Sequence, residues 1–327
     1  MPTSKICIIG GTGFVGSRIA AQLVAQGHRV TIPTRRRERH RELLVFPTVE
    51  LVEGDVHNTA FLRQLLDGQD AAINLVGILN ESGHGGRGFA RAHAELPAKI
   101  IEACRQTGVS RLLHMSALHA SLKGPSHYLR TKAMGEDTVH RAHGPDLRVT
   151  SFRPSVIFGP RDSFVNRFAA LLRLTPGMMP LACASARFQP IYAEDVARCF
   201  VASLGNHKTY GARYDLCGPK VYTLAELVAY IAACMGKRIK IVPLNQTLSW
   251  LQAAVLEWVP GKPFSLDNYK SLQIDSVCSQ TFPDVFGFQP TALESVVPGY
   301  LSAGRESRAS RAARSDDGRR AKTSAAR

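Results

Sequence analysis

Two side chains spaced by about one helical turn could together transfer a proton. Tyr128 and Lys132 form the pattern Y-x-x-x-K, and residues four apart lie on the same face of a helix. An ammonium group near a phenol stabilises the phenolate, which lowers a phenol pKa that starts near ~10 and brings it toward neutral pH. The pair predicts a tyrosine that exchanges a proton with help from a lysine, with a solvated helix pair as the alternative.

A glycine-rich turn near the start of the chain could hold a dinucleotide. Gly10, Gly13 and Gly16 have the spacing G-x-x-G-x-x-G, follow the apolar run 5–9, and open a segment with helical apolar period over 16–26. Glycine permits a positive φ and lets the backbone approach phosphate, while the N–H groups of a first helical turn favour an anion. The order of strand, turn and helix predicts a cradle for a pyrophosphate rather than an ordinary glycine-rich loop.

The end of the second expected strand, 29–33, bears on which dinucleotide would bind. The strand is followed by Arg35, Arg36 and Arg37, and the first acidic residue after the strand is Glu38. Sites for NAD(H) place a carboxylate here to accept the ribose 2′-hydroxyl, whereas a 2′-phosphate needs a cation. Because guanidinium groups pair well with phosphate, Arg35 and Arg36 favour NADP(H) over NAD(H), with a solvated arginine loop as the alternative.

Strands and helices alternate along the first half of the chain. We expect strands at 5–9, 29–33, 49–53, 70–75, 111–115 and 148–152, and helices at 16–26, 59–67, 89–107 and 127–142. This alternation predicts an α/β fold with a doubly wound parallel Rossmann sheet. From about residue 161 the alternation loosens, and the helices expected at 194–204, 223–235 and 246–258 suggest a smaller C-terminal lobe at the carboxyl edge of the sheet, where such folds bind ligands.

These patterns divide the chain into three parts. We expect a dinucleotide-binding domain over 1–160 with returning segments at about 190–220, a mixed smaller lobe over 161–301, and a disordered basic tail over 302–327. The tail consists mainly of Ala, Ser, Gly and Arg, and it has too few large apolar residues to offset the entropy of ordering. Its alternatives are a solubilising extension and an electrostatic tether to anionic lipid or nucleic acid.

Composition places the chain among globular proteins and narrows its partners. The 327 residues are 45% hydrophobic and 20% charged, which suits one large α/β domain with a smaller lobe. The net charge is +15, but the segments 35–41 and 303–327 carry nine of those charges (5 − 1 = 4 and 8 − 3 = 5). A nucleic acid is therefore an unlikely partner.

The seven cysteines are scattered, odd in number and never spaced as C-x-x-C. This pattern predicts neither a disulfide framework nor a zinc site, and it favours a reducing compartment. The sequence has no apolar run of about 18 residues, and the first strand begins too early to leave room for a signal peptide. We therefore expect a cytoplasmic protein.

Several motifs together resemble the short-chain dehydrogenase/reductase superfamily in its extended or atypical, epimerase/dehydratase-like form. They are GGTGFVG at 10–16, Asp55-Val56, NLVG at 74–77, Ser116, YLRTK at 128–132, RPSVIFGP at 153–160 and PIYAEDVA at 190–197. More narrowly, INLVGILNE, YLRTKAMGE and RPSVIFGPRDSFVNRFA are similar to bacterial relatives of the Rossmann-type accessory subunit of respiratory complex I, the ninth subunit of its alpha subcomplex. The resemblance spans about residues 5 to 275.

The resemblance implies roles for particular residues. Asp55 and Val56 would meet the adenine, the segment 74–77 would flank the nicotinamide, and Tyr128 and Lys132 would hold the nicotinamide ribose; a plain turn residue is the alternative for Asp55. The implied cofactor-binding set is Gly10, Thr12, Gly13, Phe14, Gly16, Arg35, Arg36, Asp55, Val56, Asn74, Val76, Gly77, Tyr128, Lys132 and Pro154.

The resemblance also implies partners and a location. The partners are a dinucleotide, a small-molecule substrate of unknown identity and a membrane-associated respiratory complex. The protein would then be peripheral at the cytoplasmic face of the inner membrane.

Two positions depart from the pattern of active family members. Ser116 precedes Tyr128 by twelve residues, whereas active extended members place a serine about two dozen positions before the tyrosine. Ser116 therefore either hydrogen-bonds a substrate carbonyl or simply ends a strand. His93 stands where many extended relatives carry an asparagine that relays protons, and a structural histidine is the favoured interpretation.

Three functions follow from these residues. In the first, NADPH is bound for a structural role in a protein that docks on a membrane complex. In the second, the protein is a carbonyl reductase that uses Tyr128, Lys132 and Ser116. In the third, it is a nucleotide-sugar epimerase or dehydratase.

Two further segments have open alternatives. The glycine-rich segment 80–88 beside the expected nicotinamide site is either a loop that closes over substrate or an unstructured insertion. An apolar stripe at helical spacing comprises Leu244, Leu248, Leu251, Val255 and Trp258. Core packing of the small lobe is the favoured explanation for this stripe, ahead of a helix that meets a partner or a membrane surface, and Trp250 lies off the stripe.

Overall fold

A seven-stranded sheet forms the centre of the protein in the computed structural model, which describes residues 3–81, 83–260 and 262–301. The strand order is β11-β6-β5-β4-β1-β2-β3, and every pairing is parallel. The strands are β1 Lys5–Ile9, β2 Arg29–Thr34, β3 Val49–Glu53, β4 Ala71–Asn74, β5 Arg111–Met115, β6 Arg148–Pro154 and β11 Arg213–Leu216. The predicted doubly wound Rossmann-type sheet is confirmed, whereas the tail predicted over 302–327 lies outside the described residues.

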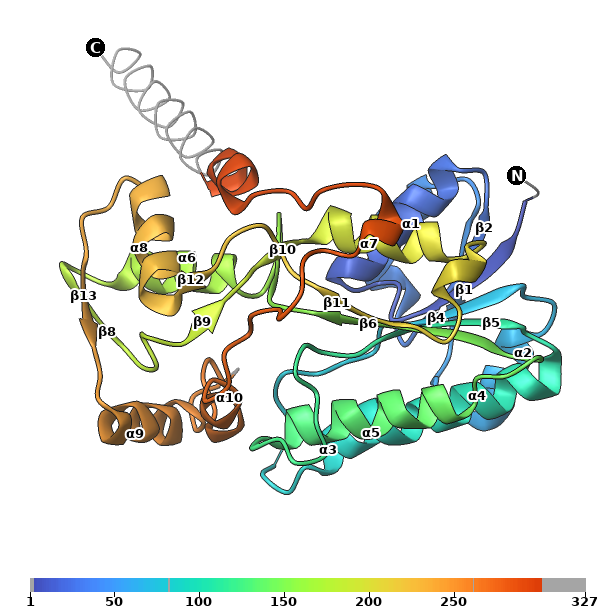
Figure 1. The fold of residues 1–327 in the computed structure, drawn as a ribbon, viewed down its shortest axis with the longest axis horizontal. Helices are drawn as coiled ribbons and strands as arrows, with labels where there is room; N and C mark the ends of the chain where they lie inside the picture. The colour runs from blue at the N-terminus through green and yellow to red at the C-terminus, as the bar shows by residue number, and fades with distance from the viewer. Residues whose placement is uncertain (1–2, 82, 261, 302–327) are drawn as a thin grey trace, which may run out of the picture.

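Helices cover both faces of the sheet, as Figure 1 shows. One face carries α1 (Phe14–Ala25) and α7 (Ala193–Ser203), and the other carries α2 (Thr59–Leu66), α4 (Leu96–Thr107) and α5 (His127–Arg141). A separate apolar core lies on each face. Strands buried on both faces in this way consist mainly of apolar residues instead of alternating with polar ones, as the run of β1 does.

The helix expected over 89–107 is divided into three parts. It begins as α3 (Arg87–Ala90), passes through a π-helical turn at Arg91–Glu95, and continues as α4. Such a bulge inserts an extra residue into the helical turn and occurs frequently at functional sites. Here the π-helical turn carries His93.

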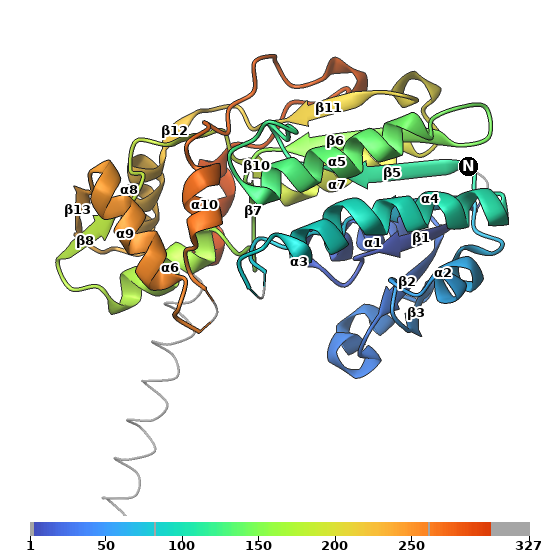
Figure 2. The same ribbon diagram turned by 90° about the horizontal axis from the view of Figure 1, so that it is seen from below.

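The small lobe lies at one end of the sheet and has its own apolar core, as Figure 2 shows. Its helices are α6 Val165–Leu174, α8 Leu224–Cys234, α9 Gln246–Leu256 and α10 Leu266–Ser271. The short strands are β7 Ile157–Phe158, β8 Met178–Leu181, β9 Arg187–Phe188, β10 Ile191–Tyr192, β12 Tyr222–Thr223 and β13 Lys240–Pro243. They pair as β10 with β7, β12 with β9 and β13 with β8. Single 3₁₀ segments lie at Arg37–Val45, His207–Thr209 and Asp284–Phe286.

The C-terminal segment contributes to both cores. The ring of Phe286 packs against Phe152 and Tyr214 of the sheet, with ring centroids 6.3 and 5.1 Å away respectively. Farther along, Leu293 and Val297 are buried in the core of the small lobe. The chain therefore crosses from the lobe to the sheet and back. Within the described parts of the chain, no helix combines the length and hydropathy that crossing a membrane requires.

One sequence expectation about the cysteines is wrong. Cys217, directly after β11, forms a disulfide with Cys278, with the Cα atoms 6.1 Å apart and a separation of 61 positions in sequence. The two positions share no local motif. They meet because β11 joins the outer edge of the sheet while the C-terminal segment returns beside it.

Candidate functional site

The glycine turn packs against its surroundings so closely that side chains are excluded. Gly10 has φ +90°, and a Cβ there would lie 3.2 Å from the Val76 nitrogen. A Cβ on Gly16 would lie 2.5 Å from the Gly10 carbonyl oxygen. Gly13 caps α1 without a side-chain acceptor, and the first turn of that helix has no acidic residue. The N–H groups of this turn are thus available to an anion, which fits the predicted pyrophosphate.

Arg18, a residue that the sequence reasoning missed, ties the start of α1 to the rest of the site. Its guanidinium donates to the carbonyl oxygens of Phe14 at 2.9 Å and Pro160 at 2.8 Å, and it forms an ion pair with Glu194 of α7 at 3.1 Å. The same group lies over the Phe14 ring, 4.4 Å from its centroid. Arg18 lies four residues after Phe14, and this helical spacing is the feature of the sequence that could have indicated the contact. Through Arg18, α7 contacts the turn that contains the partly buried Thr12 and Phe14.

Arg35 and Arg36 are exposed at the carboxyl edge of the sheet, directly after β2. The parallel pairing of β1 with β2 places this strand end beside the glycine turn. Within the described part of the chain, no hydrogen bond or ion pair engages either guanidinium group. The carboxylate of Glu53, at the end of the neighbouring β3, accepts the backbone N–H of Arg37 at 3.3 Å. Two cations therefore face solvent where the sequence predicts them.

Asp55 and Val56 follow β3 at the same edge. Asp55 Oδ1 accepts the N–H of His57 at 2.9 Å, and Oδ2 forms an ion pair with Arg91 at 3.8 Å. The side chain is half exposed. Val56 packs against the core on the α2 and α4 face. Asp55 thus closes a turn and also presents a carboxylate at the edge, which leaves both sequence interpretations open.

The segment after β4 lies directly against α5. Asn74 is buried, and its Oδ1 accepts the N–H of Val76 at 3.2 Å, which fixes the turn. A Cβ on Gly77 would lie 3.1 Å from the Lys132 Nζ and 3.6 Å from the His93 Nε2. The structure thus brings together the two groups of residues that the resemblance assigns to the nicotinamide and its ribose.

His93 holds this segment in place. Its Nε2 accepts the N–H of Ile78 at 3.0 Å, so its Nδ1 carries the proton and donates to Thr131 Oγ1, also at 3.0 Å. Burial, together with the nearby Lys132, lowers the pKa of His93 to about 2. A Cβ on Gly135 would lie 1.8 Å from the His93 carbonyl oxygen, so α5 crosses the π-helical turn at a glycine. This neutral histidine has the structural role that the sequence favoured.

Tyr128 and Lys132 lie on α5 as predicted, but the expected effect of the lysine on the tyrosine is absent. Burial raises the pKa of Tyr128 to about 12 and lowers that of Lys132 to about 8, with Glu136 opposing the latter shift. The Lys132 ammonium donates to the Met115 carbonyl at the end of β5, at 3.0 Å. Desolvation of the phenol is the cause of its raised pKa, and the predicted lowering of the Tyr128 pKa by Lys132 does not occur in this state.

The Tyr128 hydroxyl has no hydrogen-bond partner among the described residues. Its ring lies edge-on to the rings of His93 and Phe89, with centroid distances of 5.5 and 6.3 Å. The hydroxyl therefore remains able to bond a ligand. At neutral pH it is protonated, so it would act as a proton donor.

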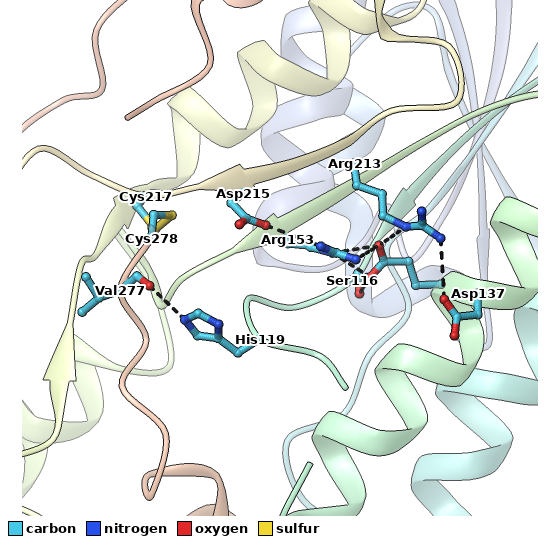
Figure 3. Close-up of polar contacts among 10 residues, drawn as sticks. Ser116, His119, Asp137, Arg153, Arg213, Asp215, Cys217, Val277 and Cys278 are labelled. Carbon is cyan, nitrogen blue, oxygen red and sulfur yellow. Dashed lines mark hydrogen bonds and ion pairs between the residues drawn. A yellow bond between two sulfur atoms is a disulfide. The ribbon is translucent and has the colours of Figure 1, made fainter. Parts of the chain in front are cut away.

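Ser116 belongs to a buried charge network, drawn in Figure 3. Its hydroxyl donates to the Glu136 carboxylate at 2.6 Å, and that carboxylate is 1% exposed. Arg153 and Arg213 reach the same carboxylate at 2.7 and 2.9 Å. Because the hydroxyl proton is already donated inside the protein, the structure favours the strand-end alternative for Ser116 over a bond to substrate. Pro154, next to Arg153, accepts the N–H of Leu118 through its carbonyl at 3.1 Å.

The small lobe caps the helix that carries Tyr128. The Asp267 carboxylate of α10 accepts the N–H groups of His127 and Tyr128 at 2.7 and 3.1 Å. Ser271 of the same helix donates to the Ser126 hydroxyl at 2.8 Å. Asp267 was not among the predicted site residues, because it lies 139 positions from Tyr128 and belongs to no local motif.

The glycine-rich segment 80–88 is attached to the small lobe. Lys262 Nζ donates to the carbonyl oxygens of Glu81 and Gly83 at 3.0 and 3.2 Å. The Glu81 carboxylate in turn accepts the N–H groups of Gly86 and Gly88. A small cavity next to this segment is lined by residues that include Glu81, His84, His127, Asp267 and Lys270. Because His127 precedes Tyr128, the cavity adjoins the first turn of α5.

Comparisons with known proteins agree with this geometry. Residues 6–217 match the NAD dependent epimerase/dehydratase family. The chain is 30% identical to the mouse mitochondrial NADH dehydrogenase [ubiquinone] 1 alpha subcomplex subunit 9 over 296 residues, covering 88% of this chain and 77% of the mouse protein. It is 29% identical to the ceramide reductase of Caulobacter vibrioides over 247 residues, covering 73% of each. The crystal structure of Pal from Bacillus thuringiensis shares the fold, with a TM-score of 0.73 at 18% identity over 91% of this chain and 99% of Pal.

Proposed function

Because the chain belongs to the NAD dependent epimerase/dehydratase family, we propose that it binds a pyridine dinucleotide at the carboxyl edge of the sheet, with NADP(H) preferred over NAD(H). The observation that carries this proposal is the position of two exposed, unpaired guanidinium groups, Arg35 and Arg36, beside the glycine turn. A 2′-phosphate is a better partner for two guanidinium groups than a hydroxyl is.

The other residues of the edge have complementary tasks in this proposal. The first turn of α1 from Gly13 holds the pyrophosphate, and Asp55 with Val56 borders the adenine. Gly77, Tyr128 and Lys132 surround the nicotinamide and its ribose. When bound, the reduced nicotinamide supplies a hydride, whereas the chain supplies orientation and a protonated Tyr128.

We propose that the dinucleotide is retained as a structural component. Ser116 and Lys132, the two polar groups that would assist Tyr128, are engaged by Glu136 and by the Met115 carbonyl. The similarity to the mitochondrial NADH dehydrogenase subunit supports a role in a membrane-associated respiratory complex. In this role, bound NADP(H) would hold the carboxyl edge of the sheet in one conformation.

A second candidate is a carbonyl reductase. The observation that favours it is the Tyr128 hydroxyl, which has no partner in the described part of the chain, while the Tyr128 ring lies against His93, the residue that holds Ile78. The similarity to a ceramide reductase also supports this candidate. Tyr128 would donate a proton to the carbonyl oxygen of a substrate, and its raised pKa keeps that proton bound until the oxygen becomes basic.

The cofactor preference can be tested by measuring dissociation constants for NADPH and NADH. Losing charge-assisted bonds to a phosphate costs more than about 1.4 kcal/mol, so we expect NADPH to bind at least about tenfold tighter. The double variant Arg35→Ala, Arg36→Ala should remove this preference. The control Arg63→Ala, Arg105→Ala loses the same charge on α2 and α4 and should keep it. Equal affinities in the unaltered protein would contradict the proposal.

The role of the dinucleotide is tested on protein purified with its nucleotide. The nucleotide is identified by mass, and the fluorescence of the reduced form is followed while carbonyl compounds and quinones are added. Persistent reduced nucleotide across the panel supports the structural role. Oxidation that disappears in Tyr128→Phe would replace it with the reductase candidate.

A further inference from the structure

Helix α9 of the small lobe turns its large apolar side chains away from the protein. Leu251 and Val255 of this helix are 49% and 58% exposed, and Trp258, in the turn directly after the helix, is 81% exposed. The side that faces the lobe carries small or polar residues instead: Ser249 and Ala253 are the buried residues of the helix. Most surface helices have the opposite arrangement. The prediction that this stripe packs in the core is therefore wrong.

Polar bonds attach α9 to the lobe. The Ser249 hydroxyl accepts the N–H of Cys183 at 3.2 Å, and Gln252 Oε1 accepts the N–H of Ala182 at 3.1 Å. These contacts fix the rotation of the helix about its axis. Because hydrogen bonds hold Ser249 and Gln252 against the lobe, the apolar side of α9 faces outward.

The paired strands β8 and β13 extend the same surface. Met178 pairs with Lys240, and Pro180 pairs with Val242, and all four residues are exposed. The intervening residues of the two strands point the other way, and Met179 packs in the core of the small lobe. Strand β13 leads directly into α9, and the Gln252 amide donates to the Pro180 carbonyl. Figures 1 and 2 both place these elements at the left end of the molecule, away from the seven-stranded sheet.

Cations predominate around this surface. The segments 163–193 and 227–256, which supply β8, most of α8, β13 and all of α9, contain six cations and no Asp or Glu, and Glu226 and Glu257 flank the second segment. The exposed cations are Arg173, Arg187, Arg238 and Lys240. Arg187 pairs with Asp275, whereas the other three form no ion pair with a carboxylate among the described residues. The surface is therefore both apolar and basic.

We propose that this outer face lies on the surface of an anionic lipid bilayer. The outer face is defined by Met178, Arg238, Lys240, Val242, Leu248, Trp250, Leu251, Val255 and Trp258. A bilayer surface offers acyl chains to the apolar residues and anionic phosphate to the cations, and indole rings favour the boundary between the two. The excess of cations over acids selects an anionic layer. This inference does not depend on the bound nucleotide, whose affinity is measured separately.

The chain carries its own reporter for this inference. It has two tryptophans, Trp250 and Trp258, and both lie on the outer face. The full-length protein is mixed with vesicles of phosphatidylcholine alone or with added phosphatidylglycerol. We expect a blue shift of tryptophan emission and quenching by brominated acyl chains with the anionic vesicles only. Added salt should weaken both effects because it screens the cations.

Charge variants keep both tryptophans and locate the contact. Since each cation near an anionic surface contributes about 1 kcal/mol, Arg238→Glu, Lys240→Glu should weaken vesicle affinity at least about 30-fold. The matched control Arg63→Glu, Arg105→Glu changes the net charge equally on the sheet domain and should retain the affinity. Equal weakening in both variants would overturn the proposal, because the attraction would then follow net charge alone.

Two further outcomes would also overturn it. Sedimentation with anionic vesicles without any change in tryptophan emission would assign the contact to another surface, such as the basic residues 303–327. A blue shift that appears without vesicles and grows with protein concentration would assign the outer face to contact between two copies of the chain. NADPH affinity should be unchanged in both charge variants, and this measurement separates the inference from the proposed dinucleotide site.

Discussion

Helices α1 and α9 have similar lengths and apolar periods but opposite relations to the protein. In α1, Ile19 and Leu23 are fully buried against the sheet, and the helix begins at a glycine turn that admits no side chain. In α9, Leu251 and Val255 face solvent while Ser249 and Ala253 face inward. Helical periodicity therefore shows that a helix has an apolar side, but it does not show what covers that side.

The polar groups around these two helices also differ in where they find their partners. In the sheet domain, polar groups such as Ser116 and Lys132 are bonded inside the protein. In the small lobe, exposed cations and exposed apolar side chains share the outer face. The polar groups of the sheet domain have their partners within the chain, whereas the partner that we propose for the outer face of the small lobe is a lipid bilayer.

The largest expected effect comes from the same substitution in both helices. We expect Leu23→Ala in α1 to lower the free energy of unfolding by about 3 kcal/mol, because it leaves a cavity in a packed core. Leu251→Ala in α9 should change it by no more than about 0.5 kcal/mol, because the side chain already contacts water. Chemical denaturation of both variants measures the difference. Similar losses of free energy in the two variants would show that Leu251 is buried within the protein, and would contradict the difference between α1 and α9.

A smaller effect concerns lysines in the two regions. Burial lowers the pKa of Lys132 to about 8 from 10.5, so between these pH values the unfolded chain binds more protons than the folded one. Lys132 therefore contributes to the free energy of unfolding a rise of about 2 kcal/mol from about pH 7.5 to about pH 9.5. Burial raises the pKa of the Cys7, Cys104 and Cys199 thiols, which act in the opposite direction in this window, so the lysine is measured as a difference between variants. The free energy of unfolding of the unaltered protein minus that of Lys132→Met should rise with pH by this amount, whereas the difference from Lys240→Met should stay constant.

The smallest effect concerns a contact that joins the two regions. Asp267→Asn removes the negative charge from the N-terminus of α5 while keeping an acceptor, so we expect a loss of about 1 kcal/mol in the free energy of unfolding. Asp146→Asn, at an exposed position, should have no measurable effect. Thermal unfolding of both variants is the measurement. No difference between them would mean that the lobe does not stabilise α5 through this carboxylate.

The sequence predicted the sheet well because its signals are local. The strands β1 to β6 have ordinary lengths, with apolar residues in continuous runs or at alternate positions. The glycine spacing predicted the turn, and the structure gives its steric reason at Gly10 and Gly16. The six predicted strands are confirmed, with ends that differ by no more than two residues. The helix over 89–107 was predicted as continuous because periodicity does not reveal a π-helical turn.

The remaining features depend on contacts between distant residues. Asp267 reaches Tyr128 across 139 positions, and Glu136 gathers Ser116, Arg153 and Arg213 from separate elements. The direction of the Tyr128 pKa shift followed from burial, which the spacing of Tyr128 and Lys132 does not contain. The inward side of α9 likewise depends on hydrogen bonds to residues 182 and 183.

The disulfide between Cys217 and Cys278 turns part of the small lobe into a covalent ring. The span 217–278 that it closes contains α8, β13, α9 and α10, and therefore includes both tryptophans and Asp267. A single break of the main chain anywhere inside this ring would leave the two fragments joined at the edge of the sheet. The helix that carries the outer face is thus tethered to the sheet at both ends of its segment, so a pulling force on that helix reaches β11 by two routes.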